Sequence, residues 1–152
     1  MKTRIILAAL FFTTLISACK KDKPDLTENA AELLQNKDWK IVSLTIHPAY
    51  YGITDALSTW DACDLDDLHR FNPDYVYVLN SGAELCYTGE EQEQTGFWSY
   101  TDATKMLSFS LQPYGDNYTL TLRQISENHF VAFDKLVEDG VEYTGTWEFE
   151  KQ

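Results

Sequence analysis

The stretch MLSFSLQPYGDNYTLTLRQIS, residues 106–126, decides the fold of this chain. Hydrophobic side chains recur there at every second residue, on both sides of a polar turn at residues 114–117. Successive side chains of a β-strand point to opposite faces, so this period of two predicts two antiparallel strands, each with one buried face. The set assigned to the interior is Leu107, Phe109, Leu111, Tyr118, Leu120 and Leu122.

The same alternation continues on both sides of this stretch and predicts strands joined mostly by short turns. Short connections make neighbouring strands antiparallel, and a closed sheet has no exposed edge. We therefore predict an all-β fold, an eight-stranded antiparallel up-and-down barrel. Its strands are expected at residues 39–47, 67–71, 75–80, 96–101, 106–111, 118–126, 129–136 and 141–150.

Residues 27–37, TENAAELLQNK, predict a short N-terminal helix. Ala30, Leu33 and Leu34 share one face of it at helical spacing. A helix of about 11 residues is not stable alone, so it must dock on the barrel. Residues 48–62 are expected to be irregular, and residues 83–94 to be mostly an acidic loop.

Composition limits the classes of partner. The 152 residues contain 44% hydrophobic residues, which suits one domain with an ordinary core, at residues 27–152. The formal net charge is −12, and it becomes more negative if Lys2 and Arg4 are removed with a leader segment. An acidic surface repels phosphate backbones, so we expect no nucleic-acid partner. We also expect a monomeric protein.

The N-terminus, MKTRIILAALFFTTLISAC, predicts export. Lys2 and Arg4 precede an apolar segment, residues 5–16, that is too short to span a bilayer. Small residues then follow, as cleavage by a signal peptidase requires. This pattern predicts that residues 1–18 are a signal peptide.

The tetrad Ile16-Ser17-Ala18-Cys19 resembles the lipobox of bacterial lipoproteins. The resemblance implies that Cys19 carries acyl chains and that residues 19–26 tether the domain to a membrane. Several buried acyl chains make release negligible, whereas one alone binds weakly. The expected location is the bacterial cell envelope, as an outer-membrane lipoprotein at the periplasmic face or the cell surface. The alternative is an ordinary signal peptide with a chance cysteine.

Residues 33–150 resemble the lipocalin-like domain found in many bacterial lipoproteins. The matching segments are Leu33-Leu34 through Trp39-Lys40-Ile41, Cys63-x-x-Asp66-Asp67 with Phe71, Cys86, Gly96-x-Trp98, and Tyr143–Phe149. This resemblance implies a lipocalin-like barrel that holds a small ligand.

The two cysteines other than Cys19 are Cys63 and Cys86. Outside the cytoplasm an even pair predicts a disulfide, which would join the segment before the second strand to the acidic loop. Two free thiols are the alternative. A zinc pair is disfavoured because neither cysteine belongs to a Cys-x-x-Cys motif.

The interior aromatic residues raise the question of a ligand. An eight-stranded barrel either fills with side chains or holds one small molecule, in a cavity of at least about 300 Å³. Our leading hypothesis is a small apolar ligand, and the rival is a non-catalytic interaction or structural module with a filled core. The candidate lining residues are Trp39, Tyr77, Phe109, Tyr143 and Trp147.

No pattern predicts catalysis, a cofactor or a metal site. The sequence has neither Gly-x-Ser-x-Gly nor His-Glu-x-x-His. The acidic cluster in residues 61–67 lacks the glycine-turned spacing of a calcium loop, and we expect it to be solvated. His47, His69 and His129 lie on three different predicted strands without paired ligand spacing. We expect that the protein is not an enzyme.

Overall fold

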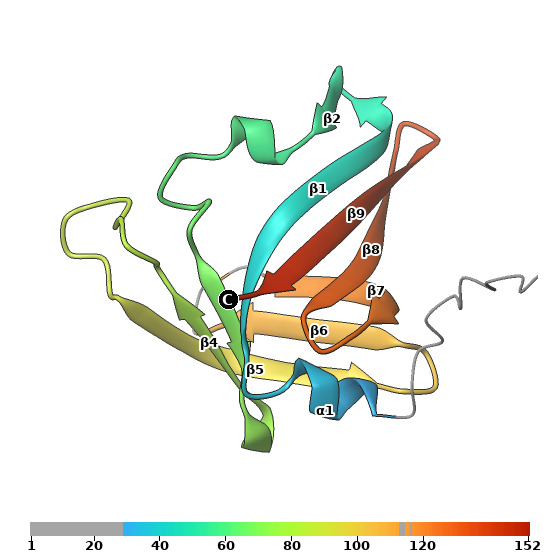
Figure 1. Ribbon diagram of the computed structural model, residues 1–152. Helices are drawn as coiled ribbons and strands as arrows, with labels where there is room; N and C mark the ends of the chain where they lie inside the picture. Colours follow the sequence, from blue (N-terminus) through green and yellow to red (C-terminus); the bar gives the residue numbers. More distant parts are fainter. Residues whose placement is uncertain (1–28, 113–114, 116) are drawn as a thin grey trace, which may run out of the picture.

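The computed structural model describes residues 29–112, 115 and 117–152, which together form a barrel (Figure 1). The predicted signal peptide, Cys19 and the tether lie outside the described residues. In the described part, no helix combines the length and the apolar character needed to cross a membrane. The elements are α1 (Ala30–Leu34), β1 (Asp38–Tyr50), β2 (Ile53–Asp55), β3 (Leu68–Phe71), β4 (Val76–Asn80), β5 (Glu93–Thr101), β6 (Met106–Leu111), β7 (Asn117–Ile125), β8 (His129–Glu138) and β9 (Val141–Lys151).

Eight antiparallel strands close the barrel, as the alternation predicts. From β3 to β9 each strand pairs with the next along the chain. β1 completes the circle by pairing with β9 from Trp39 to His47 and with β3 through Asp38 and Trp39. The two register pairs between β1 and β3 are far fewer than those between β1 and β9, so the wall is short at this seam.

Two local predictions differ from the structure. The segment expected to be irregular contains β2, which pairs with the distal part of β1, and all three of its residues are exposed. The helix predicted at residues 27–37 is shorter: α1 ends at Leu34, because Gln35 is extended and bridges to Phe71. Asn36 then adopts a positive φ of 57°, which turns the chain into β1.

One end of the barrel is tightly packed, and we call it the closed end. It is the end at which β1 begins and β9 ends, and α1 lies against it (Figure 1). Leu34 and Trp39 are fully buried there, and the Trp39 indole Nε1–H donates a hydrogen bond of 2.8 Å to the Leu34 carbonyl oxygen. Phe130 and Phe149 stack with their ring centroids 4.1 Å apart. The short helix therefore acts as a plug whose backbone is fixed by a core tryptophan.

Candidate functional site

The opposite end of the barrel contains a cavity of about 450 Å³, and we call it the open end. Strand residues form its walls, and the connecting segments 56–67 and 81–92 contribute residues at its rim. The lining residues are Ile41, Trp60, Asp64, Asp67, His69, Tyr77, Leu79, Glu90, Phe109, Leu111, Tyr118 and Trp147. The barrel is therefore filled at one end and hollow at the other.

Aromatic rings dominate the wall of this cavity. Phe109 and Tyr118 stack at 5.0 Å, and Tyr118 meets Trp147 edge-on at 5.9 Å. Trp60, from the connecting segment rather than a strand, lies edge-on to Trp147 at 6.4 Å. Such a surface offers both apolar contact and the electron-rich faces of π-systems.

His69 and Tyr77 form the polar pair of the cavity. The His69 Nδ1 atom lies 2.7 Å from the Tyr77 hydroxyl, and both side chains are buried. Burial lowers the pKa of His69 to about 4, so the imidazole is neutral at pH 7. The hydroxyl satisfies one ring nitrogen, and the other makes no hydrogen bond within the described part of the chain.

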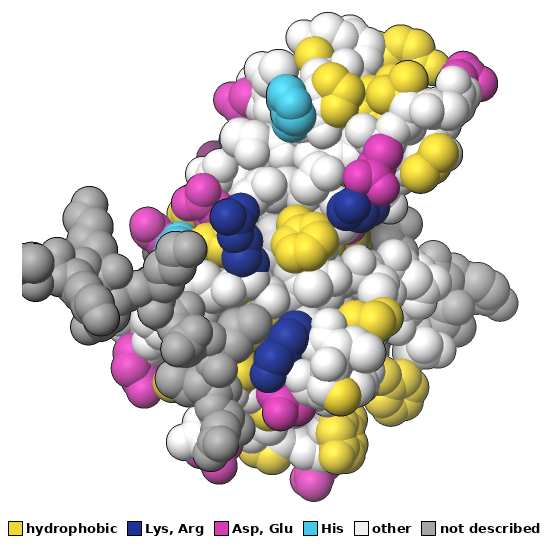
Figure 2. Space-filling model, turned by 90° about the vertical axis from the view of Figure 1, so that its right-hand side faces the viewer, with side chains coloured by type: hydrophobic (Ala, Val, Ile, Leu, Met, Phe, Trp, Pro, Cys, Tyr) yellow, Lys and Arg dark blue, Asp and Glu magenta, His cyan; other side chains and the backbone are white. Residues whose placement is uncertain are grey.

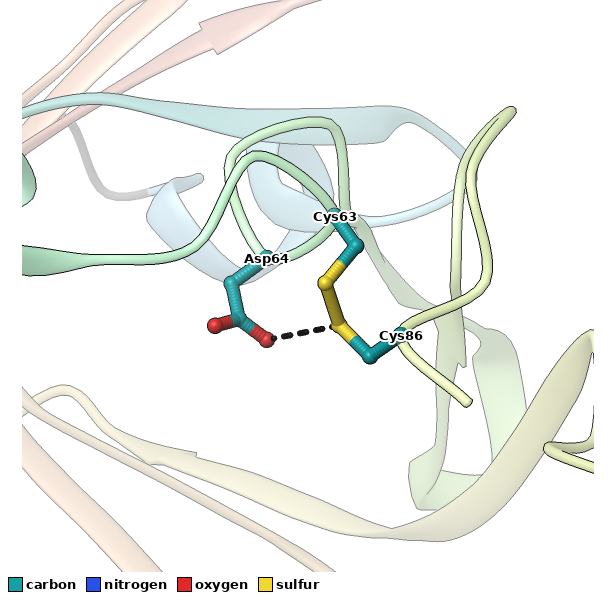
Figure 3. Close-up of side chains that lie close together, drawn as sticks. All are labelled: Cys63, Asp64 and Cys86. Atoms are coloured by element: carbon teal, nitrogen blue, oxygen red, sulfur yellow. Dashed lines mark hydrogen bonds between the residues drawn. A yellow bond between two sulfur atoms is a disulfide. The ribbon is translucent and has the colours of Figure 1, made fainter. Parts of the chain in front are cut away.

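The disulfide predicted between Cys63 and Cys86 is confirmed (Figure 3). It joins the two connecting segments that border the cavity, so neither can move from the rim independently. Asp64 Oδ1 lies 3.3 Å from the Cys86 sulfur. A disulfide sulfur carries no proton, so this is a polar contact rather than a donated hydrogen bond.

Carboxylates gather at the same rim. Glu90 accepts a hydrogen bond of 2.6 Å from the Cys86 backbone N–H, and Asp66 accepts one of 2.6 Å from that of Ala83. Asp67 has no such donor among the residues that the structure describes. Desolvation, with repulsion from Asp64 and the other neighbouring carboxylates, raises the pKa of Asp67 to about 7.

The predicted ligand-binding residues divide into two groups. Tyr77, Phe109 and Trp147 line the cavity. Trp39 faces the interior but lies at the closed end, and Tyr143 contacts Tyr50 edge-on at 5.0 Å outside the cavity lining. Alternation thus identified the inward face of each strand but not the depth of a residue along the barrel axis.

Nine of the lining residues were not among the predicted ligand-binding residues, and they include Trp60, Asp64, Asp67, His69 and Glu90. Of these five, all except His69 lie on connecting segments, which the disulfide joins at the rim. Trp60 lies three residues before Cys63, so the predicted disulfide could have placed it near the acidic loop. His69 offered a weaker one, because it alternates with Phe71 on β3 and so shares its inward face.

Cys63, Asp64 and Cys86 place three possible metal-ligand atoms within 4.8 Å of one another. Both sulfurs are bonded to each other, so neither is a thiolate, which is the form that binds metal. The oxidised group has one carboxylate and no other strong metal ligand.

A scan against models of known protein families found no match, and a search of curated proteins found none either.

Proposed function

We propose that this chain is a membrane-anchored, lipocalin-like lipoprotein of the bacterial envelope that binds a small apolar molecule in the barrel. The cavity at the open end carries this proposal. Its volume of about 450 Å³ falls within the usual range for small-molecule sites, and most of its lining is aromatic and aliphatic, with Asp64, Asp67, His69 and Glu90 as the polar exceptions. A module with a filled core has no need for such a space.

Native mass spectrometry of the full chain, isolated from envelopes, tests ligand binding. Leu111 lines the cavity, and Leu111→Trp would occupy part of it. Leu136 is exposed on β8, so Leu136→Trp is the matched control. We expect a non-covalently bound molecule on the wild-type chain and on the control, but not on Leu111→Trp. Equal occupancy of all three chains, or an empty wild-type chain, would contradict the proposal.

The anchor is tested separately. Cys19→Ser removes the only sulfur that a lipobox could acylate, so the variant should lose the mass of the lipid and leave the membrane fraction. Cys63→Ser provides the control, because it alters a cysteine that is not in the tetrad. A wild-type chain with an unmodified Cys19, or membrane association that survives Cys19→Ser, would overturn the anchoring.

A second function, display of a protein-binding surface, is favoured by one observation. Hydrophobic side chains gather on the projecting end of the molecule, where β2 and the β8–β9 hairpin lie (top of Figure 2). Its exposed members are Tyr51, Ile53, Leu136, Val137 and Val141. Tyr51→Ser with Val137→Ser should abolish co-purification of a stoichiometric partner if this surface binds one; retention of the partner would exclude it.

A further inference from the structure

The charge at the rim of the cavity is of one sign. Among the lining residues, Asp64, Asp67 and Glu90 are carboxylates, and none is lysine or arginine. Since the buried His69 is neutral at pH 7, it adds no positive charge. The ion pairs of the described residues involve other side chains, so no protein cation neutralises these three acids.

The three carboxylates are grouped around the disulfide at the rim. Glu90 is bound by the Cys86 N–H at 2.6 Å, and Asp64 contacts the disulfide sulfur at 3.3 Å. Asp67 immediately precedes β3, the strand that carries His69 into the cavity. The disulfide therefore keeps mutually repelling groups together, an arrangement that an incoming positive charge would relieve.

The aromatic lining also favours a cation. Trp60 at the rim, with Trp147 and Tyr118 on the strands, contributes aromatic rings, and the negative faces of such rings attract ammonium groups. His69 also lines the cavity, and its second ring nitrogen has no hydrogen-bond partner among the described residues. An anionic ligand such as a fatty acid would instead bring its charge against three carboxylates.

We infer that the cavity selects an organic cation, an amine or ammonium group attached to an apolar or aromatic body. The body occupies the aromatic wall, and the positive charge lies at the rim beside Asp64, Asp67 and Glu90. This inference rests on the proposed function, because it specifies the ligand class of the same cavity. A bare metal ion fits less well, since it would leave the aromatic wall empty.

Calorimetry with three probes that share one carbon skeleton separates the two proposals. The full chain in phosphatidylcholine nanodiscs is titrated at pH 8 with 4-phenylbutylamine, 4-phenylbutanol and 4-phenylbutyrate, and empty nanodiscs supply the background. We expect the amine to bind about tenfold more tightly than the alcohol, because ring faces and carboxylates both attract it, and the acid to bind most weakly.

Substitutions locate the selectivity. Asp64→Asn with Asp67→Asn should reduce the preference for the amine several-fold, because only Glu90 and the aromatic rings still attract the charge, and should change binding of the alcohol much less. Asp102→Asn, which removes an acid paired with Lys105 away from the cavity, should keep the preference. A preference that the double substitution leaves unchanged would overturn the assignment to these acids. Equal binding of amine and alcohol would overturn only the cation selectivity, and no binding of any probe would overturn the proposed function as well.

Discussion

The two ends of the barrel use aromatic side chains in opposite ways. At the closed end, Trp39, Phe130 and Phe149 are fully buried and packed against one another and α1. At the open end, Trp60 and Trp147 line a cavity of about 450 Å³ beneath two disulfide-linked segments. The comparison indicates that the closed end carries most of the stability and leaves the open end free to form a site.

Truncation of a closed-end tryptophan should produce the largest effect. Trp39→Ala removes a fully buried ring and its hydrogen bond to Leu34, so we expect a loss of about 4 kcal/mol in the free energy of unfolding. Trp60→Ala, at the half-buried rim, should cost only about 1 kcal/mol. Urea denaturation measures both losses, and equal losses would abolish the distinction between the ends.

Removal of the disulfide should affect the open end selectively. Cys63→Ser with Cys86→Ser removes a cross-link across a sequence separation of 23 residues. The chain-entropy model gives such a cross-link a stabilisation of about 3 kcal/mol in the free energy of unfolding. Hydrogen exchange should become much faster in segments 56–67 and 81–92. Amides of β1 and β9 near the closed end should lose only the protection that the lower global stability accounts for. Uniform quickening throughout the barrel would show that the cross-link supports the whole fold.

The polar groups of the open end should give opposite pH dependences. His69 has a pKa of about 4 in the folded state, whereas in the unfolded chain it takes up a proton near pH 6.5. Acidification from about pH 6.5 to 4 should therefore lower the free energy of unfolding by up to about 3 kcal/mol. Asp67 has the opposite effect, because its pKa is higher in the folded state than in the unfolded chain. Its stabilisation of the folded state is complete below about pH 4 and is lost as the pH rises through 7. The half-exposed Asp67 should have the smaller effect.

Two substitutions separate these contributions in denaturation curves at pH 4, 5, 6 and 7. Asp67→Asn should make stability rise more steeply with pH than in the wild-type chain. His69→Gln should reverse that slope, so that stability falls as the pH rises towards 7. Curves for the two variants that run parallel to the wild type would mean that neither group titrates abnormally.

The smallest effect concerns the seam between β1 and β3. Arg70 binds Asp38 through two hydrogen bonds of 2.7 and 2.8 Å, at one of the two register pairs that join these strands. Arg70→Lys loses this two-point geometry and should cost about 0.5 kcal/mol. Lys135→Gln, which breaks the exposed pair with Glu142, should cost almost nothing. If chemical denaturation finds the two losses equal, the seam needs no special support.

The barrel could be predicted well because the alternation that indicates each strand lies within one short segment of sequence. Alternation at residues 106–126 and in the other strands identifies the inward face wherever one side of a strand is buried. β2 was missed because Ile53, Thr54 and Asp55 are all exposed and show no alternation. The end of α1 was missed because tertiary pairing of Gln35 with Phe71 overrides its helical preference.

The candidate site was predicted only in part, because it depends on distant segments. Tyr77, Phe109 and Trp147 follow from strand alternation, and Cys63 with Cys86 follows from pairing of cysteines. The acidic rim does not follow in this way. Asp67 and Glu90 approach each other only when the disulfide brings two irregular segments over the mouth of the barrel.

Fluorine NMR of the chain labelled with 5-fluorotryptophan tests the contrast between the ends most directly. The four tryptophans are Trp39, Trp60, Trp98 and Trp147. Trp60 and Trp147 line the cavity, whereas the indoles of Trp39 and Trp98 donate hydrogen bonds to the backbone of Leu34 and Asn72. Titration with 4-phenylbutylamine should shift the Trp60 and Trp147 signals saturably and leave the other two in place. Four unmoved signals, or four that move together, would contradict the account.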